Sequence, residues 1–458
     1  MENDSSQDGY QNMNFAEIGL QVPTLLLPRD GTPYADWAVV ACDQYTWQPE
    51  YWEQVRRITE GMPSTLNLIF PEVYLESEER ERIIGQIHRS MEEYLDQGML
   101  APQKPGFALV DRQTPHAASR KGLIVALDLE EYDYREGAQT LIRTTEGTLV
   151  ERLPPRIAIR ENAPIEVPHI MVLIDDPEKT VIEPLFERKL ETLYDFPLMQ
   201  GGGHLRGYRV DQEELIRQVA ERLARLADPE LFSRKYGVEE APVLLYAMGD
   251  GNHSFATAKE IWEKLKREAG DREAIMRHPA RHALVELINV HDEGLEFEPI
   301  HRLVYDVDVD GMLEDMERFY RRQRIKFARR MFASREEWEN GCQQLDSAHH
   351  CVLYVAEGRY GALWIDDPHH HLEVASLQTF LDAHLEMLPR ARMDYIHGEE
   401  AVVALGERPG NIGFFFPAIP KHDLFKTIIL DGAFPRKTFS MGEADEKRFY
   451  LECRQIVP

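Results

Sequence analysis

The segment Leu244–Lys259 constrains the fold of this chain more than any other, because it predicts a strand, a tight polar turn and a helix in close succession. An apolar run ends at Gly249–Gly251, the triplet Asn252–Ser254 follows, and helix-forming residues continue through Lys266. Such an arrangement directs free backbone N–H groups and the positive end of the helix dipole at one small spot. Phosphate and other anions bind at such places, so the segment predicts an anion site.

The spacing of this turn matches neither the GxxxxGKS/T phosphate loop nor the GxGxxG dinucleotide motif. An alternative interpretation is an ordinary strand-to-helix turn in which one polar residue caps the helix. However, four different polar side chains stand together where a cap needs only one of them. We therefore take the turn as a candidate site, with Asp250 and His253 as catalytic candidates and with phosphate-binding candidates Gly249, Gly251, Asn252 and Ser254.

The net charge of the 458-residue chain is −28 at pH 7, which disfavours binding to nucleic acids or to an anionic membrane surface. A few arginines can still form a local pocket, so the expected partner is a small anionic metabolite or nucleotide. The first residues lack the basic and apolar parts of a secretory signal, and we expect a cytoplasmic protein. The four cysteines are expected to be free thiols, and nothing in the sequence predicts zinc, haem or flavin. The sequence leaves the oligomeric state open.

Strand-like and helix-like segments alternate along the chain, which predicts an α/β or mixed α+β protein with a mixed sheet. We expect a flexible tail over residues 1–14, a main α/β ligand-binding domain over 15–300, and a C-terminal α/β region over 301–458 that packs on it. The region 143–176 is expected to consist of turns around one buried strand. Apolar spacing predicts helices that include Pro49–Ile58, Ile182–Tyr194, Gln212–Leu226, Val309–Arg322, Val374–His384 and Glu443–Glu452.

A second candidate site is the loop Met199–Arg209, in which three consecutive glycines give the backbone unusual freedom. A glycine loop followed by basic side chains suits an anion, because backbone N–H groups and a guanidinium can surround it. The alternative is a mobile surface loop that links two helices. The ligand-binding candidates here are Gly201, Gly202, Gly203, His204 and Arg206.

A third candidate is a segment rich in arginine, in which Arg152, Arg156 and Arg160 recur every four residues. Asp175 and Asp176 follow at the end of a predicted strand. Guanidinium groups hold phosphate or carboxylate, and an acid pair offers the oxygen ligands that Mg²⁺ prefers. We predict Arg160 as an anion ligand and Asp175 with Asp176 as metal ligands. The alternative is an arginine–carboxylate network on an exposed turn.

Several further residues are weaker candidates. Asp43 follows an apolar run, and a carboxylate at a strand end is a common position for a catalytic base, although Asp43 could equally begin a turn. His301, Arg302 and Lys437 stand in short basic segments that could contribute to an anion site.

Taken together, several of these strings resemble the DUF1015 family, over most of the chain from about Val22 to Met441. The specific parts are YAMGDGNHSFATAK, LYDFPLMQGGGHLRGY, VERLPPRIAIRENAPIEVPHIMVLIDD, FEPIHRLV and FPRKTFSMG. Many members of that family carry an Asp-Gly-His-His-Arg loop. The corresponding loop here is Asp250–Ser254, which resembles a distinct branch and lacks the arginine.

The Asp-Gly-His-His-Arg loop is also similar to one in free-serine kinases of the ParB/sulfiredoxin-like superfamily. That resemblance implies a strand–loop–helix element in which Asp250, Gly251 and His253 meet the phosphates of a nucleotide. In those enzymes an acidic residue from an earlier segment is the base for the serine hydroxyl. The assignment of Asp43 to this role is an inference from its position at a strand end, not a match.

These patterns lead to the hypothesis of a phosphotransferase that acts on serine or a similar metabolite, with ATP, ADP or pyrophosphate as donor and with Mg²⁺. Two alternatives stay open: a nucleotide- or metabolite-binding regulator without turnover, and a phosphomonoesterase that uses the same pocket. The hypothesis expects the two glycine-containing loops, at 201–206 and 249–254, to converge on one anion.

Overall fold

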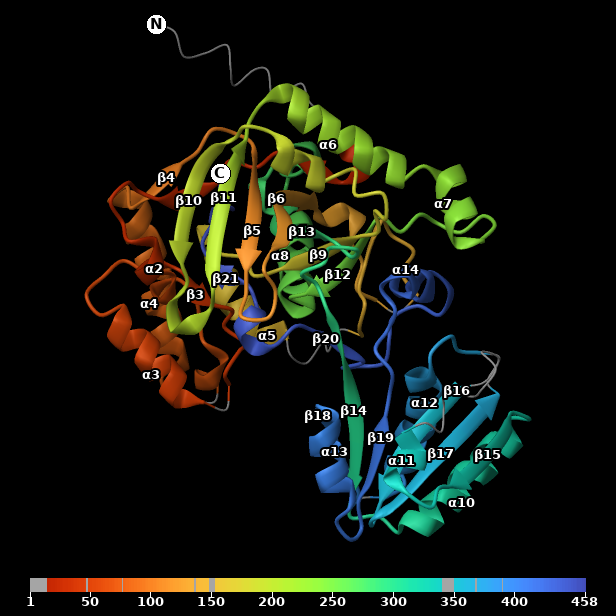
Figure 1. The fold of residues 1–458 in the computed structure, drawn as a ribbon. Helices are drawn as coiled ribbons and strands as arrows, with labels where there is room; N and C mark the ends of the chain where they lie inside the picture. Colours follow the sequence, from red (N-terminus) through yellow and green to blue (C-terminus); the bar gives the residue numbers. More distant parts are fainter. Residues whose placement is uncertain are drawn as a thin grey trace, which may run out of the picture. The chain divides into compact units, whose positions relative to one another are not determined.

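The computed structural model describes residues 15–458, except residues 47, 76, 136, 148–152, 340–349, 367–368 and 389. The predicted tail over residues 1–14 lies outside this range. The chain forms two compact units (Figure 1). The first contains the chain up to Glu296 together with Met441–Pro458, and the second contains Phe297–Ser440. The last residues of the chain are therefore part of the first unit.

The first unit is built on a mixed sheet of nine strands within the described residues, in the order β10-β11-β5-β6-β13-β9-β12-β7, with β1 paired to β6. Two neighbouring pairs are parallel, β13 with β9 and β12 with β7, and the other pairs are antiparallel. This confirms the predicted mixed α/β class. The strands are β1 (Leu20–Gln21), β5 (Phe107–Gln113), β6 (Arg120–Asp128), β7 (Ile142–Arg143), β9 (Met171–Ile174), β10 (Glu191–Pro197), β11 (His204–Val210), β12 (Tyr246–Asp250) and β13 (His282–Asn289).

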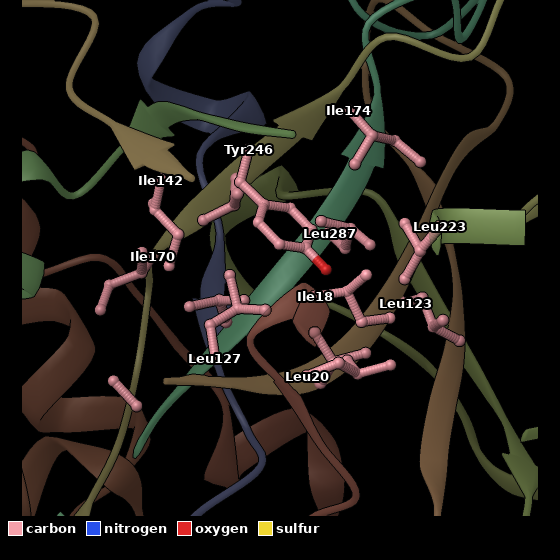
Figure 2. Packing of buried hydrophobic residues seen from close by; sticks show 14 of the residues in the cluster. Ile18, Leu20, Leu123, Leu127, Ile142, Ile170, Ile174, Leu223, Tyr246 and Leu287 are labelled. Atoms are coloured by element: carbon pink, nitrogen blue, oxygen red, sulfur yellow. The ribbon is translucent and has the colours of Figure 1, made fainter. Parts of the chain in front are cut away.

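The central strands form because their sequences are apolar almost without interruption, as expected for strands covered on both faces. All four residues of β9 are buried, as are seven of the eight residues of β13. Figure 2 shows how side chains from different elements meet in this core, with Leu127 of β6, Leu287 of β13 and Tyr246 of β12 around a common centre. Helix α6 (Glu213–Leu226) adds Leu223 to the same cluster through its apolar face.

The other helices of the first unit surround this sheet and its small satellite strands. Three two-stranded pairs join distant segments: β2 with β4, β3 with β21, and β8 with β22. The two pairs that contain β21 and β22 bind the last residues of the chain into the first unit. Their bounds are β2 (Leu26–Pro28), β3 (Val39–Val40), β4 (Leu100–Pro102), β8 (Ile165–Glu166), β21 (Phe449–Tyr450) and β22 (Arg454–Gln455). The helices are α2 (Tyr34–Trp37), α3 (Pro49–Ile58), α4 (Arg80–Asp96), α5 (Leu153–Arg160), α7 (Pro229–Tyr236), α8 (Asn252–Glu268) and α9 (Arg272–Ile275).

Three sequence predictions in this unit are wrong. The segment 182–194 is not an α-helix: a short 3-10 helix at Glu183–Glu187 is followed by β10, in which Tyr194 and Phe196 are buried at the two-residue spacing of a strand. The segment 443–452 contains a short 3-10 helix at Ala444–Glu446 and then β21. Conversely, the arginine-rich segment expected to form turns becomes helix α5, because its two prolines stand in the first turn, where no intrahelical N–H is needed.

The second unit is a sheet in the order β15-β17-β16-β19-β14-β18, with β20 paired to β14. Buried side chains of α10 and α12 share one core cluster with β16, β17 and β19, and α11 and α13 share another. Helix α10 has the predicted bounds. The elements are β14 (Phe297–Tyr305), β15 (Lys326–Met331), β16 (His350–Ala356), β17 (Arg359–Asp366), β18 (Arg392–His397), β19 (Ile412–Phe415), β20 (Phe439–Met441), α10 (Val309–Arg322), α11 (Arg335–Glu339), α12 (Glu373–Leu385), α13 (Glu399–Gly406) and α14 (Lys421–Leu430).

The cysteines only partly follow the expectation of free thiols. Cys42 and Cys453 are free. Cys351 is bonded in a disulfide, so the expectation is wrong for this residue. Among the described residues, no helix combines the length and the apolar character that a membrane span requires.

Candidate functional site

The predicted strand, turn and helix are present at the junction of β12 and α8, which we call the β12–α8 corner (residues 249–254). β12 ends at Asp250, Gly251 adopts a left-handed φ of 79°, and α8 begins at Asn252. A Cβ atom on Gly251 would lie 3.0 Å from the Cα of Ile170, and one on Gly249 would lie 2.8 Å from Cε of Met441. Gly251 is therefore favoured by its left-handed backbone and by the close Ile170 backbone, and Gly249 by the Met171 carbonyl at 3.1 Å, since the end of the Met441 side chain can move.

The start of α8 is suited to an anion. Gly251 has no side chain that could cap the helix, and the first turn contains no acidic residue. The N–H groups of that turn and the positive end of a 17-residue helix therefore have no acidic side chain of the first turn beside them, and the carboxylate of Asp250 precedes them at the end of β12. Thr144 donates a hydrogen bond to the side-chain oxygen of Asn252 at 2.9 Å, which fixes this amide at the helix start. The hydroxyl of Thr257 donates to the backbone oxygen of His253.

Asp250 is held as a carboxylate by residues that approach from two directions. Its Oδ2 lies 3.2 Å from Nζ of Lys447, and its Oδ1 accepts a hydrogen bond of 2.7 Å from the N–H of Gly251. Burial alone would raise the pKa of Asp250, but the Lys447 ammonium, His169 and the Gly251 N–H together bring it below its usual value. Lys447 also donates to the carbonyl of Met441 at 3.1 Å. An ammonium has three N–H donors, so one is left for a ligand.

A chain of hydrogen bonds extends from the first turn of α8 into the protein. The hydroxyl of Ser254 lies 3.4 Å from Nε2 of His169, and Nδ1 of that ring lies 2.7 Å from the hydroxyl of Tyr450. The backbone N–H of Cys42 donates to the Tyr450 oxygen at 3.2 Å. His169 is 7 % exposed, so the ring is shielded from solvent. The contact of a hydroxyl, an imidazole and a second hydroxyl resembles the arrangement in which a base is oriented beside a nucleophile.

Ser254, His169 and Tyr450 line a cavity of about 130 Å³. Two arginines of α5 also line it, because their spacing of four residues places them on one side of the helix. Arg156 forms an ion pair with Glu72, and Arg160 forms one of 2.6 Å with Glu166. The remaining wall is mostly apolar, with Cys42, Leu68, Ile69, Phe70, Leu75, Met91, Ile159, Ala163, Ile165, Val167, Pro168, Ile170 and Thr257.

Glu72 was not found by sequence reasoning, yet it lies at the centre of the charged groups of this cavity. Burial raises the pKa of Glu72, the Arg156 guanidinium opposes that effect, and the nearby Asp43 carboxylate adds to it. The backbone N–H of Glu72 donates to the carbonyl of Cys42 at 2.8 Å, which brings the neighbouring Asp43 close. Asp43 therefore lies on the cavity side of the molecule, next to a second carboxylate. No local motif surrounds Glu72, so the sequence contains no signal for it.

The second predicted loop is located elsewhere. Gly201–Gly203 form the turn of the β10–β11 hairpin, and Nε2 of His204 lies 2.5 Å from Oδ1 of Asp195. Arg206 pairs with the same carboxylate at 3.3 Å. β11 is five positions away from β12 in the sheet, and the turn packs against β21, because a Cβ atom on Gly202 would lie 2.5 Å from the ring of Phe449. Residues 201–206 do not line the cavity that Ser254 lines, so the predicted convergence of the two loops is not observed.

The predicted metal ligands are occupied by protein donors. Asp175 accepts from His291 at 2.7 Å and from Tyr236 at 2.5 Å, and it pairs with Lys235 at 2.9 Å. Asp176 accepts from the backbone N–H groups of residues 180 and 181, which fixes the turn after β9. Within the described ranges, no three His, Cys, Asp or Glu side chains are grouped as metal ligands. The geometry therefore does not support Mg²⁺ at these two carboxylates.

The remaining candidates belong to the second unit, whereas the β12–α8 corner belongs to the first. Arg302 is fully buried and donates to the carbonyls of Ile300, Arg436 and Lys437. It therefore holds a loop of its own unit. His301 accepts from the N–H of Phe416 at 3.2 Å, and burial together with Arg302 lowers its pKa to about 4.

Comparison with known proteins gives a family but no established activity. No curated protein matches the chain. Solved structures with a partial likeness include a conserved hypothetical protein from Pyrococcus furiosus, at 12% identity and a TM-score of 0.35, covering 73% of this chain and 95% of that one. A free serine kinase variant in complex with AMP has 10% identity and a TM-score of 0.38, with coverage of 73% and 92%.

A truncated SbnI from Staphylococcus aureus has 9% identity and a TM-score of 0.34, with coverage of 70% of this chain and 82% of that one. With TM-scores below 0.5, these likenesses are too weak to assign an activity to this chain. The sequence profile of DUF1015, described as a protein of unknown function, matches residues 26–384, which is most of the chain. The chain belongs to the DUF1015 family.

Proposed function

We propose that this protein is a phosphate-handling enzyme, a phosphotransferase that moves a phosphoryl group onto the hydroxyl of serine or a similar small metabolite. The observation that carries the proposal is the ion pair between Asp250 and Lys447 at the start of α8. It places an ammonium beside the positive end of a helix whose first turn carries Ser254, and Ser254 lines a cavity together with His169.

The positive groups of the corner would hold the phosphates of the donor. The first-turn N–H groups of α8 and the remaining N–H donor of Lys447 can bind phosphate oxygens, and charge stabilisation supplies most of the catalysis in phosphoryl transfer. Asp250 would keep the ammonium charged and correctly placed. Its carboxylate oxygens already contact Lys447 and Gly251, so we assign it a positioning role.

The carboxylates at the other side of the cavity would serve the acceptor. Glu72 lines the cavity, burial raises its pKa, and the nearby Asp43 carboxylate adds to that effect, which suits a carboxyl group that exchanges protons with the acceptor. Arg156 lines the same cavity and pairs with Glu72. A guanidinium suits the carboxylate of an amino acid, so Arg156 would orient such an acceptor in the cavity. The choice of serine rests on the resemblance of the Asp250–Ser254 loop to that of free-serine kinases.

The test is phosphate transfer from ATP, ADP or pyrophosphate to L-serine, with free phosphoserine measured by mass spectrometry. We expect product with the unaltered protein and a loss of about 100-fold or more with Lys447→Met, the size of effect seen when one charge-stabilising donor is removed. Asp250→Asn should show a similar loss. The matched control is Asp228→Asn, since Asp228 caps α7 and asparagine caps equally well. Equal turnover of the Lys447→Met protein and the unaltered one would contradict the proposal, as would the absence of product with all three donors.

A further inference from the structure

The contact between Ser254 and His169 suggests more than phosphate binding. A serine in the first turn of a helix commonly bonds to the backbone of its own helix. The hydroxyl of Ser254 instead lies near the imidazole of His169, a residue that precedes β9. Both side chains, together with Tyr450, line one cavity. A hydroxyl, a base and a group that orients the base therefore meet where a substrate can enter.

Tyr450 holds the ring of His169 from the side opposite the serine. Its hydroxyl lies 2.7 Å from Nδ1 of His169, and its oxygen accepts the N–H of Cys42 at 3.2 Å. In the tautomer that donates Nδ1–H to the Tyr450 oxygen, the lone pair of Nε2 is directed at the Ser254 hydroxyl. A base role for His169 requires this tautomer.

We propose that Ser254 is a nucleophile that accepts the phosphoryl group from a phosphoanhydride donor and forms a phosphoseryl intermediate, with His169 as its base. This inference rests on the proposed function and adds a covalent step to it. The Ser254 oxygen attacks the terminal phosphorus, and the bond from phosphorus to the leaving diphosphate or phosphate breaks. The hydroxyl proton passes to Nε2 of His169.

In the second half of the reaction, the hydroxyl oxygen of the acceptor attacks the same phosphorus, and the bond to the Ser254 oxygen breaks. The acceptor proton passes to the carboxylate of Glu72 and then to solvent, and the imidazolium returns its proton to Ser254. The donor loses one phosphoryl group, the acceptor gains it, and one proton is released. Tyr450 is a positioning residue, because it acts through the ring of His169.

The surroundings fit a phosphorylated Ser254. Its phosphate would lie at the positive end of α8, where a dianion is stabilised, and Arg156 and Arg160 line the cavity together with the carboxylates that they pair, Glu72 and Glu166. Much of the cavity wall is apolar, including Ile165, Val167 and Ile170, which limits the access of water. Exclusion of water favours transfer to an acceptor over hydrolysis of the intermediate.

The experiment is incubation of the whole protein with γ-³²P-labelled ATP or with ³²P-labelled pyrophosphate, first without and then with L-serine. We expect label on Ser254 by peptide mapping, and its release as free phosphoserine when serine is added. Ser254→Ala should take up no label. The matched control is Ser233→Ala, because Ser233 is also a half-buried serine on a helix of the first unit. Unchanged urea unfolding of Ser254→Ala excludes misfolding as the cause.

Substitution of the base and of its positioning residue should have different effects. His169→Asn should reduce the labelling rate by at least 100-fold, as is typical for the loss of a general base. Tyr450→Phe removes the acceptor for Nδ1–H, which disfavours the imidazolium, so the pH profile of labelling should shift to lower pH. A Tyr450→Phe protein with reduced labelling and an unshifted profile would overturn the positioning role.

Three outcomes separate this inference from the proposed function. If Ser254→Ala forms free phosphoserine at an unchanged rate and without label on the protein, Ser254 is not the nucleophile. The proposed phosphotransferase function would still hold in that case. Label on Ser254 without free phosphoserine would support the nucleophile and overturn serine as the acceptor. If the unaltered protein gives neither label nor product, both the proposed function and the inference fail.

Discussion

The ammonium of Lys447 lies 3.2 Å from the carboxylate of Asp250, so a residue near the end of the chain completes the corner where β12 meets α8. Lys447 is mostly buried, and its second partner is the carbonyl of Met441. The pair therefore holds the segment that follows Met441 against the first unit. Its loss should affect the stability of the fold as well as the proposed chemistry.

The first prediction concerns the pH dependence of this pair. Because the pKa of Asp250 is lowered in the folded protein, its contribution to stability is present above the unfolded value of about 3.9 and is lost as the pH falls through the folded value. Asp250→Asn should lower the free energy of unfolding at pH 7 by about 1–3 kcal/mol. Urea unfolding at pH 7, 5 and 3.5 should show this difference shrinking only at the acidic end. A difference that grows on acidification would contradict the assignment.

The second prediction compares two glycines of the β10–β11 hairpin. Gly201 and Gly203 both have a left-handed φ, but a Cβ atom on Gly203 would overlap the carbonyl of Gln113, whereas one on Gly201 meets nothing within 4 Å. Gly201→Ala should therefore lower the free energy of unfolding by only about 1–2 kcal/mol, because of backbone strain. Gly203→Ala should lower it clearly more, as measured by thermal or urea unfolding. Equal costs would mean that close packing does not explain the glycines of this loop.

A third prediction concerns Glu166, which is 3% exposed and accepts from Arg454 at 2.6 Å and from the N–H of Leu284 at 2.9 Å. Glu166→Gln leaves the buried Arg454 and the half-buried Arg160 without their carboxylate, so the free energy of unfolding should fall by about 3–5 kcal/mol. The comparison is Glu213→Gln, which breaks an exposed pair with Arg217 and should cost less than about 1 kcal/mol. A small effect at Glu166 would show that the network relaxes around the lost charge.

The fourth prediction concerns His301, whose pKa is lowered to about 4 by burial and by Arg302. The ring should be neutral at pH 7, and its NMR chemical shifts should stay constant from pH 8 to about pH 5. Because the folded pKa lies below the unfolded value of about 6.5, its contribution to stability is complete above that value and declines as the pH falls toward 4. An inflection above pH 6 would refute the neutral assignment.

The sequence predicted the parts of the molecule that depend on local patterns. The β12–α8 corner was predicted because one short segment contains the residue patterns of a strand, a glycine turn and a helix start. Helix α10 was predicted from its apolar spacing. The helix predicted at 182–194 failed because pairing with β11 overrides helical propensity in β10.

Three residues that complete the candidate site could not be predicted, because Tyr450 in β21, Lys447 before it and Glu72 after α3 come from segments with no motif of their own. His169 precedes β9 within one of the family strings, but no local pattern links it to Ser254. Only the tertiary structure brings them to Ser254 and Asp250. For the glycine loop, the composition predicts an anion site, which stays a prediction, whereas the structure explains Gly203 by the close approach of the Gln113 backbone.

The matched family stretch stops at residue 384, whereas β21 and β22 complete two small sheets with β3 and β8. A recombinant fragment trimmed to that stretch would lack Lys447, Tyr450 and the buried Arg454. Such a fragment would leave two strands without hydrogen-bonding neighbours, and its inactivity would be no evidence against the corner at α8.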